Sequence, residues 1–167
     1  MFGLLKRKNI EAQYGEALFE AALAKAQQHG STFFADDYPT EDVNLRQQRF
    51  ETVALFMAVV LWRLKADDAM ATTAQYTYDT MFLSFDRSLR ESGVGDIGVA
   101  HRIKKFAQAF HGRLKTYGDA LDAQNNTALL NAVAHNMQLP TAELEAMVNA
   151  AYTWARDLQA KPVADLV

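Results

Sequence analysis

Apolar side chains recur at steps of three and four residues along most of this chain, and no stretch shows the alternation with period two that is typical of a strand. That spacing places the apolar residues of a segment on one side of a helix, and such helices are stable when they pack against one another. The chain has 167 residues, 50% of them hydrophobic, which is enough for one domain with a buried core. The pattern therefore predicts an all-α fold, a single-domain helical bundle of about six helices.

Glycine, proline and threonine residues beside these apolar segments indicate where the helices begin and end. The expected helices span approximately residues 10–29, 45–65, 70–91, 99–121, 127–137 and 141–159. Residues 31–44 are expected to form a loop whose aromatic side chains lie against the core. In this interpretation residues 10–160 are the helical domain, residues 1–9 are a flexible basic N-terminal tail and residues 161–167 are a C-terminal tail.

The segment 53–62 is apolar around nearly its whole helical circumference, including Phe56, Val59 and Trp62. It is far shorter than the ~20 residues that a membrane-spanning helix needs. A helix that is apolar on all sides is normally central in its domain, so we expect this segment to be buried. The alternative is that part of it is exposed as an interaction site.

A short turn with two glycines separates the third and fourth expected helices. Gly93 stands where a chain leaving a helix needs a left-handed residue, a conformation that glycine adopts at little cost. Asp96 is expected to begin the next helix by capping its free amide groups. We therefore expect two helices to meet at a short corner formed by Asp86, Arg90, Glu91, Gly93, Gly95 and Asp96.

Charged side chains near this corner are spaced to interact along the third helix. Asp86 with Arg90, and Arg87 with Glu91, are four residues apart and are expected to form surface ion pairs. Alternatively, Asp86 and Asp79, which share a face, hold the corner by accepting its free amides or by pairing with an arginine. Both interpretations give these residues a structural role first.

Positive charge is concentrated on the fourth expected helix. Residues 97–118 contain five basic residues and no acidic residue, while the whole chain has a net charge of −3. A one-sided basic surface attracts anionic partners. Gly112 lies opposite the apolar stripe of this helix, and a glycine inside a helix costs ~1 kcal/mol relative to alanine. We therefore expect a partner-binding face formed by Arg102, Lys104, Lys105, Gly112, Arg113 and Lys115. The alternatives are a merely solvated helix face and a glycine that admits another helix of the same chain.

Several of these residues occur in a recognisable order: LRESGVGD at residues 89–96, the basic pair 104–105, FHGR at residues 110–113, and Tyr117. Together with Arg49-Phe50-Glu51, Asp79, Phe82 and Asp86, they resemble the ubiquinol-cytochrome c chaperone family over residues 46–121. The chain departs from that pattern at Ala100, where the family usually has proline, and at Phe56, where it often has histidine. The resemblance implies a helical assembly factor that attends newly made cytochrome b of respiratory complex III.

Signals of an enzyme are weak. The four histidines are scattered and form no pair with the spacing of metal ligands on one helix, and the chain has no cysteine, no glycine-rich phosphate loop and no G-x-S-x-G motif. We therefore expect no catalysis, no metal and no cofactor. The alternative is an enzyme in which the helical bundle binds a cofactor. Colour or bound metal in the purified protein would support this alternative.

The resemblance implies cytochrome b as the client, with a ribosome or a second assembly factor as further partners. The alternative is a helical module that binds nucleic acid or the ribosome through the basic helix 99–121, although the sequence pI of about 5.8 speaks against specific DNA binding.

The N-terminal segment MFGLLKRK has too few apolar residues for a signal peptide. It also lacks the length and the Arg- and Ser-rich composition of a transit peptide. We therefore expect a bacterial cytoplasmic protein, which could also associate peripherally with the inner membrane. The mitochondrial matrix is the alternative if a presequence has been removed. Three apolar and three basic side chains in this segment allow weak contact with an anionic membrane surface, and a frayed tail is the simpler interpretation.

Overall fold

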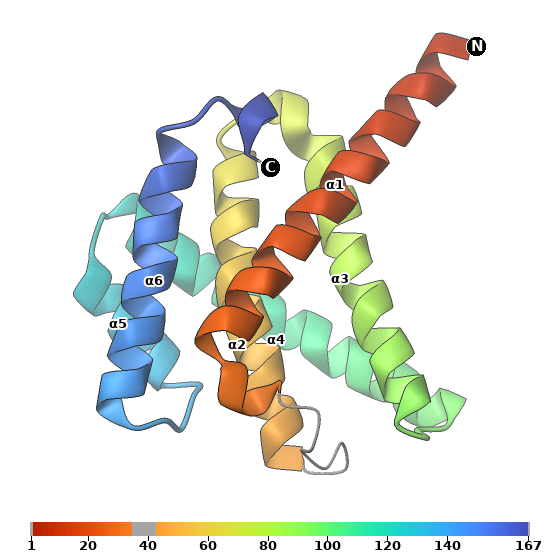
Figure 1. Ribbon diagram of the computed structural model, residues 1–167. Helices are drawn as coiled ribbons and strands as arrows, with labels where there is room; N and C mark the ends of the chain where they lie inside the picture. The colour runs from red at the N-terminus through yellow and green to blue at the C-terminus, as the bar shows by residue number, and fades with distance from the viewer. Residues whose placement is uncertain (1, 35–42, 167) are drawn as a thin grey trace.

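The computed structural model describes residues 2–34 and 43–166, except for the side chains of residues 2–8, 32 and 43. This part of the chain contains no strand and is built from six α-helices and three short 3₁₀ helices. The α-helices are α1 (Phe2–His29), α2 (Val43–Lys65), α3 (Ala71–Glu91), α4 (Asp96–Asp122), α5 (Asn126–Ala134) and α6 (Thr141–Gln159). The 3₁₀ helices are η1 (Ser31–Phe33), η2 (Asp68–Met70) and η3 (Val163–Asp165). The predicted all-α bundle is confirmed (Figure 1).

α2 is the central helix, and α1, α3, α4 and α6 pack around it (Figure 1). Every residue from Val53 to Val60 is at most 2% exposed, which confirms the expected burial of this apolar segment. Trp62, near the C-terminal end of the helix, is half-buried instead. A helix that is apolar on all sides needs neighbours on all sides, so the sequence of α2 explains its central position.

α1 crosses α3 at close range, and Gly15 is the residue that permits this contact. A Cβ atom on Gly15 would lie 2.8 Å from the Cβ of Tyr76 and 2.9 Å from the backbone nitrogen of Thr77. On the same helix, Leu18 and Phe19 are buried in the core. The crossing thus depends on the missing side chain at residue 15.

The first helix is longer than the sequence predicted, and the residues that follow α6 contact it. α1 begins at Phe2 and not near residue 10, so the backbone of residues 2–9 continues the helix. This segment contains no proline and is rich in helix-forming leucine, lysine and arginine, which explains the extension. At the other end, the Tyr14 hydroxyl donates a hydrogen bond to the carbonyl oxygen of Val163 at 2.7 Å and accepts one from the amide of Leu166 at 3.0 Å. The C-terminal segment therefore packs against α1.

The connection between α1 and α2 is described in part. Phe33 and Phe34 are partly buried against the core, as expected for the aromatic side chains of this loop. Residues 35–42, which include Tyr38 and Pro39, lie outside the described residues. The Arg49 guanidinium donates from Nε to the carbonyl oxygen of Phe33 and lies over the ring of Phe34, which ties this connection to α2.

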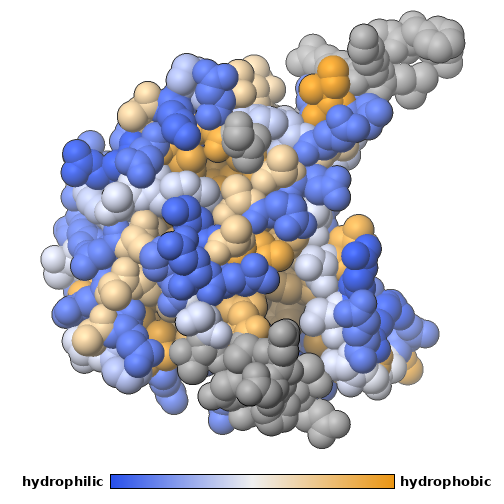
Figure 2. All heavy atoms as spheres, viewed as in Figure 1, coloured by the Kyte–Doolittle hydropathy of each residue, from blue (hydrophilic) through white to orange (hydrophobic). Residues whose placement is uncertain are grey.

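The face formed by α1 and α6 is mostly hydrophilic, and hydrophobic side chains appear between the helices (Figure 2). None of the described helices combines the length and the apolar character that a bilayer crossing requires.

Candidate partner-binding surface

The corner between α3 and α4 has the geometry that its sequence predicts at Gly93. Gly93 has a φ of 79°, in the left-handed region. Its amide donates to the carbonyl oxygen of Arg90 at 2.9 Å, and the amide of Val94 donates to that of Leu89 at 3.1 Å. These two bonds satisfy free carbonyl groups at the end of α3, so the helix ends in a defined way.

Arg90 joins the two helices at this corner. Its guanidinium pairs with Asp86 at 2.6 Å and also contacts the carboxylate of Asp96. The hydrogen bonds to Asp86, and then those to Asp96, raise the pKa of Arg90. The expected pair of Asp86 with Arg90 is therefore present, and the bridge spans from α3 to the first residue of α4.

Three details of the corner differ from what the sequence predicted. Gly95, with extended dihedrals, is the residue that precedes α4, and Asp96 is the first helical residue with its carboxylate turned to Arg90. Asp96 therefore does not cap the helix, because a capping residue must itself have non-helical dihedrals. Within the described residues, Glu91 and Arg87 are exposed and form no ion pair with each other. Asp79 accepts a hydrogen bond from Gln75 at 2.7 Å, and among the described residues no ion pair joins it to an arginine of the corner.

The outer face of α4 carries part of the predicted basic set. Lys104 and Lys105 are exposed, and Lys115 is exposed and pairs with Asp119 at 2.6 Å. Apart from its chain neighbours and the adjoining backbone of α4 itself, no atom of the described chain lies within 4 Å of the Cβ position of Gly112, so this glycine does not admit another described helix. These residues present an open, basic helix surface.

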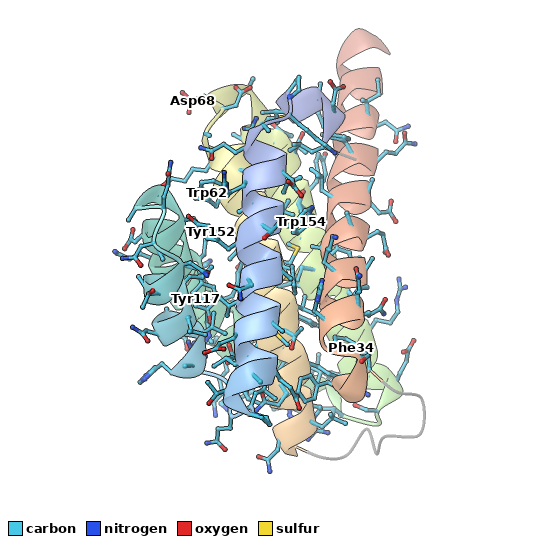
Figure 3. The ribbon with its side chains drawn as sticks, turned by 60° about the vertical axis from the view of Figure 1, so that its left-hand side comes forward. Phe34, Trp62, Asp68, Tyr117, Tyr152 and Trp154 are labelled. Carbon is cyan, nitrogen blue, oxygen red and sulfur yellow. The ribbon has the colours of Figure 1, made fainter. Side chains whose placement is uncertain are left out.

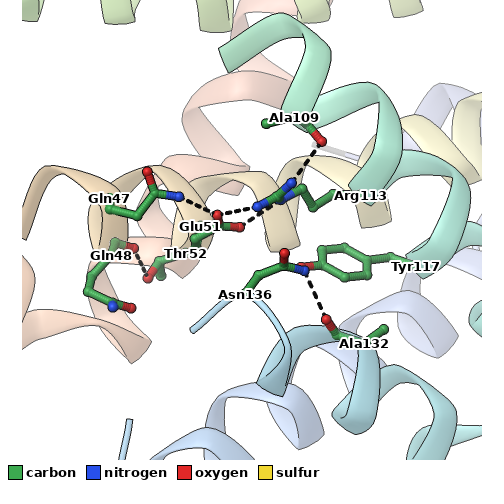
Figure 4. Close-up of polar contacts among 9 residues, drawn as sticks. All are labelled: Gln47, Gln48, Glu51, Thr52, Ala109, Arg113, Tyr117, Ala132 and Asn136. Carbon is green, nitrogen blue, oxygen red and sulfur yellow. Dashed lines mark hydrogen bonds and ion pairs between the residues drawn. The ribbon is translucent and has the colours of Figure 1, made fainter. Parts of the chain in front are cut away.

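Arg113 points the other way, into the bundle (Figure 4). Its Nη2 lies 2.5 Å from Oε1 of Glu51 and its Nε donates to Oε2 at 2.9 Å. The side chain of Glu51 is 0% exposed and that of Arg113 is 18% exposed, so the pair is internal. The hydrogen bond to Glu51 raises the pKa of Arg113. While this pair holds, Arg113 is not available to a partner.

The same polar cluster includes Tyr117 and Asn136 (Figure 4). Asn136 Nδ2 donates to the Tyr117 hydroxyl at 3.3 Å, and burial raises the pKa of Tyr117 to about 12. Arg102, another member of the predicted binding face, is half-buried, and its Nη1 is a buried atom with no hydrogen-bond partner among the described residues. The structure thus separates the predicted basic set into exposed lysines and arginines that are turned towards the protein.

A groove that the sequence analysis did not predict lies beside the outer face of α4, between α2, α3 and α4. It has a volume of about 950 Å³. Its walls include Trp62, Tyr78 and Leu114, and its charged residues are Lys65, Lys115, Asp119 and Asp122. We call this feature the α2–α3–α4 groove. A sequence signal for it was Trp62, a large aromatic residue at the end of the apolar segment 53–62.

Polar contacts hold the walls of the groove in place. Trp62 Nε1 donates to Oδ1 of Asp122 at 2.7 Å, which joins α2 to α4, and Trp62 lies on the side of the bundle shown in Figure 3. The hydroxyl of Tyr78 lies 3.1 Å from Nε2 of His111, and their rings stack with centroids 5.8 Å apart, which joins α3 to α4. The described residues contain no group of three or more His, Cys, Asp or Glu side chains that could hold a metal ion.

Comparison with known proteins assigns the chain to a family. The family model for ubiquinol-cytochrome c chaperones matches residues 43–167. The chain belongs to this family. The match includes α5 and α6, which lie beyond the residues 46–121 that carried the resemblance in the sequence. Membership makes this ubiquinol-cytochrome c chaperone an assembly chaperone of respiratory complex III.

A solved structure supports the same assignment. The crystal structure of the Cbp3 homolog from Brucella abortus is similar to this chaperone with a TM-score of 0.74 and 28% sequence identity, over 99% of this chain and 91% of that chain. A comparison with curated proteins found no match.

Many residues that carried the family resemblance hold this chaperone together. Arg49 binds the segment after α1, Glu51 and Arg113 pair between α2 and α4, and Asp86 binds Arg90 at the corner. Phe56, at the position where the family often has histidine, is fully buried and stacks on His29. Most residues of the recognisable motif therefore stabilise the packing of the helices. The exposed residues between them form the surface available to a partner.

Proposed function

We propose that this chaperone holds newly made cytochrome b and promotes its assembly into ubiquinol-cytochrome c reductase, without catalysing a reaction. The observation that carries this proposal is the family match over residues 43–167. The scaffold suits the task, because the internal pair of Glu51 and Arg113 and the corner bridged by Arg90 keep α4 in place while its outer face stays open. Holding a client stabilises its assembly-competent state by mass action and keeps it from wrong partners.

The outer face of α4 is the client-binding surface in this proposal. Lys104, Lys105 and Lys115 supply exposed positive charge, and Gly112 leaves the helix backbone open to close approach. Arg102 lies on the flank of the same helix. Arg113 supports this surface from inside through Glu51 and is not one of its contacts. We place the protein in the bacterial cytoplasm, peripheral at the inner membrane where its client is inserted.

A pull-down from respiring cells tests the proposal. Tagged protein is recovered in mild detergent while cytochrome b is being made, and unassembled cytochrome b is measured by mass spectrometry. The variant Lys104→Glu with Lys105→Glu reverses two exposed charges without breaking a described ion pair. We expect wild-type protein to recover cytochrome b and the variant to recover much less.

The matched control is Arg156→Glu with Lys161→Glu, which makes the same charge change on exposed residues at the C-terminal end of α6. This control should recover cytochrome b as well as wild type does. Equal recovery by both double variants would move the binding surface away from α4. No recovery by the wild-type protein would reject cytochrome b as the client.

The basic face of α4 also supports a second candidate, binding to the ribosome or to another nucleic acid. This candidate predicts that association weakens steeply as salt rises, because phosphate contacts release counterions. Binding of purified ribosomes is therefore measured between low and physiological salt with the same pair of double variants. Ribosome binding that is lost in the α4 variant, without recovery of cytochrome b, would favour this candidate.

A further inference from the structure

We propose that the α2–α3–α4 groove is a docking site for an apolar α-helix of the client, of the kind that spans a membrane. This inference rests on the proposed function, because it specifies how that client is held. It concerns a surface that adjoins the basic face of α4 and shares Lys115 with it, while its other lining residues are different.

The lining of the groove suits a helix. Trp62, Tyr78 and Leu114 form apolar walls, and the small residues Ala74 and Gly118 also line the groove. Small residues allow the backbone of a partner helix to approach closely, and larger side chains on both sides enclose it. Two further alanines, Ala66 and Ala71, extend this lining of small residues.

The size of the groove also suits a helix. It follows α4 from His111 to Asp122, a distance of about 16 Å at the helical rise of 1.5 Å per residue. About three turns of a client helix would therefore lie along it. The volume of about 950 Å³ provides room for the side chains on one face of those turns.

The charges of the groove favour a neutral occupant. Its lining contains two lysines, Lys65 and Lys115, and two aspartates, Asp119 and Asp122. Lys115 already pairs with Asp119, and Asp122 accepts the hydrogen bond from Trp62. Because these charges balance and are largely engaged, a strongly acidic or basic peptide gains little here. A newly made membrane helix is apolar on its whole surface and gains most from being covered outside the bilayer.

Trp62 makes occupation of the groove measurable. The chain has two tryptophans, and Trp154 is replaced by phenylalanine so that Trp62 is the only reporter. The probe is a synthetic helix of about 20 leucine and alanine residues, the length of a membrane span, with one lysine and one glutamate at its ends. Titration of the full-length protein with this probe in mild non-ionic detergent should give a saturable blue shift of Trp62 emission. No saturable change would overturn the proposal.

Filling the groove tests where the probe binds. In Gly118→Leu, the new Cβ would contact Trp62 at an ordinary distance of 3.9 Å, and replacing a glycine within a helix favours folding. We expect this variant to bind the probe at least about tenfold more weakly than the wild type. Losing a central contact in a binding pocket has an effect of this size. Ala74→Leu fills the groove from α3 and should act in the same direction. Ala142→Leu, an exposed substitution at the far end of α6, should bind like wild type.

Two comparisons complete the test. The same titration with haemin, an anionic planar molecule, and with a basic amphipathic peptide distinguishes other occupants, and tighter binding of either at Trp62 would overturn the proposal. Pull-down of cytochrome b with Gly118→Leu then separates this inference from the proposed function. Equal recovery by wild type and Gly118→Leu overturns the groove as the docking site and leaves the client in place. Probe binding without any recovery of cytochrome b supports the groove and rejects cytochrome b.

Discussion

The pair of Glu51 and Arg113 shows how a single buried charge is kept in this protein. The carboxylate of Glu51 is fully buried in α2, and it accepts hydrogen bonds from Arg113 at 2.5 and 2.9 Å and from Gln47 at 2.5 Å. A buried carboxylate is costly unless its oxygen atoms are satisfied in this way. The pair therefore fixes how α2 and α4 pack against each other, and Arg113 cannot be removed without cost.

Breaking this pair should destabilise the fold strongly. Glu51→Leu leaves the partly buried guanidinium of Arg113 without its partner, and we expect a loss of about 3 kcal/mol in the free energy of unfolding. The double variant Glu51→Leu with Arg113→Leu removes both charges and should recover most of that loss. Urea unfolding of the two variants and the wild type measures the coupling. A double variant as unstable as Glu51→Leu alone would contradict the assigned role.

His29 should make stability depend on pH. Burial, and secondarily the charge of Lys25, lower the pKa of His29 below its ordinary value of 6.5, and its ring stacks on Phe56. The unfolded chain therefore takes up a proton at higher pH than the folded protein does. As the pH falls from 6.5 towards the lowered pKa, the folded state should lose stability.

The measurement compares the free energy of unfolding at pH 8 and pH 5.5 for wild type and for His29→Gln. The decrease on acidification should be smaller in the variant, because glutamine does not titrate. An equal decrease in both proteins would assign the pH dependence to other groups.

At the scale of whole helices, two glycines serve opposite purposes. Gly15 in α1 lies against α3, where an added Cβ would come within 2.9 Å of backbone and side-chain atoms. Gly112 in α4 has no atom of another described helix within 4 Å of its Cβ position. The same residue type therefore permits close packing in α1 and leaves an open surface in α4. Contacts within the protein explain the cost of a helical glycine at Gly15 but not at Gly112.

Replacing each glycine by alanine should change stability with opposite sign. Gly15→Ala forces α1 and α3 apart, and we expect a loss of about 2 kcal/mol. Gly112→Ala meets no obstacle and should gain roughly 0.5–1 kcal/mol from helix propensity. Thermal unfolding of the two variants measures both effects. If Gly112→Ala is stabilised yet recovers less cytochrome b, the open backbone serves the client, and unchanged recovery would remove Gly112 from the binding surface.

At the scale of the molecule, the sequence predicted the features that depend on local periodicity, namely the positions of helices and the burial of apolar segments. The bounds 141–159 agree with α6, and the central burial of residues 53–60 follows from their uniform apolarity. The orientation of Arg113 could not be predicted, because its partner Glu51 is 62 residues away in the sequence and no local pattern links the two residues. The groove was also missed, since it forms from three helices whose relative positions no local pattern specifies. Residue patterns were sufficient to identify the family. Locating the groove and the exposed face of α4 required the three-dimensional packing of the helices.

The C-terminal segment is a further feature that only packing reveals, and it should matter for the whole bundle. Arg63 in α2 donates hydrogen bonds to the carbonyl oxygens of Leu158 at 2.9 Å and Lys161 at 2.8 Å, while Tyr14 in α1 binds residues 163 and 166. Leu166 is only 5% exposed. The segment after α6 therefore links the first, second and last helices.

Deleting residues 161–167 should lower the free energy of unfolding by about 2–4 kcal/mol, from the lost burial of Leu166 and the lost hydrogen bonds. Tyr14→Phe removes the hydroxyl alone and should cost about 1 kcal/mol. Both proteins should still unfold in one cooperative transition, because the deletion spares the central contacts of α2. Urea unfolding followed by circular dichroism measures these differences. If the deletion variant is as stable as the wild-type protein, the segment is an accessory tail and the linkage through Tyr14 and Arg63 has no energetic role.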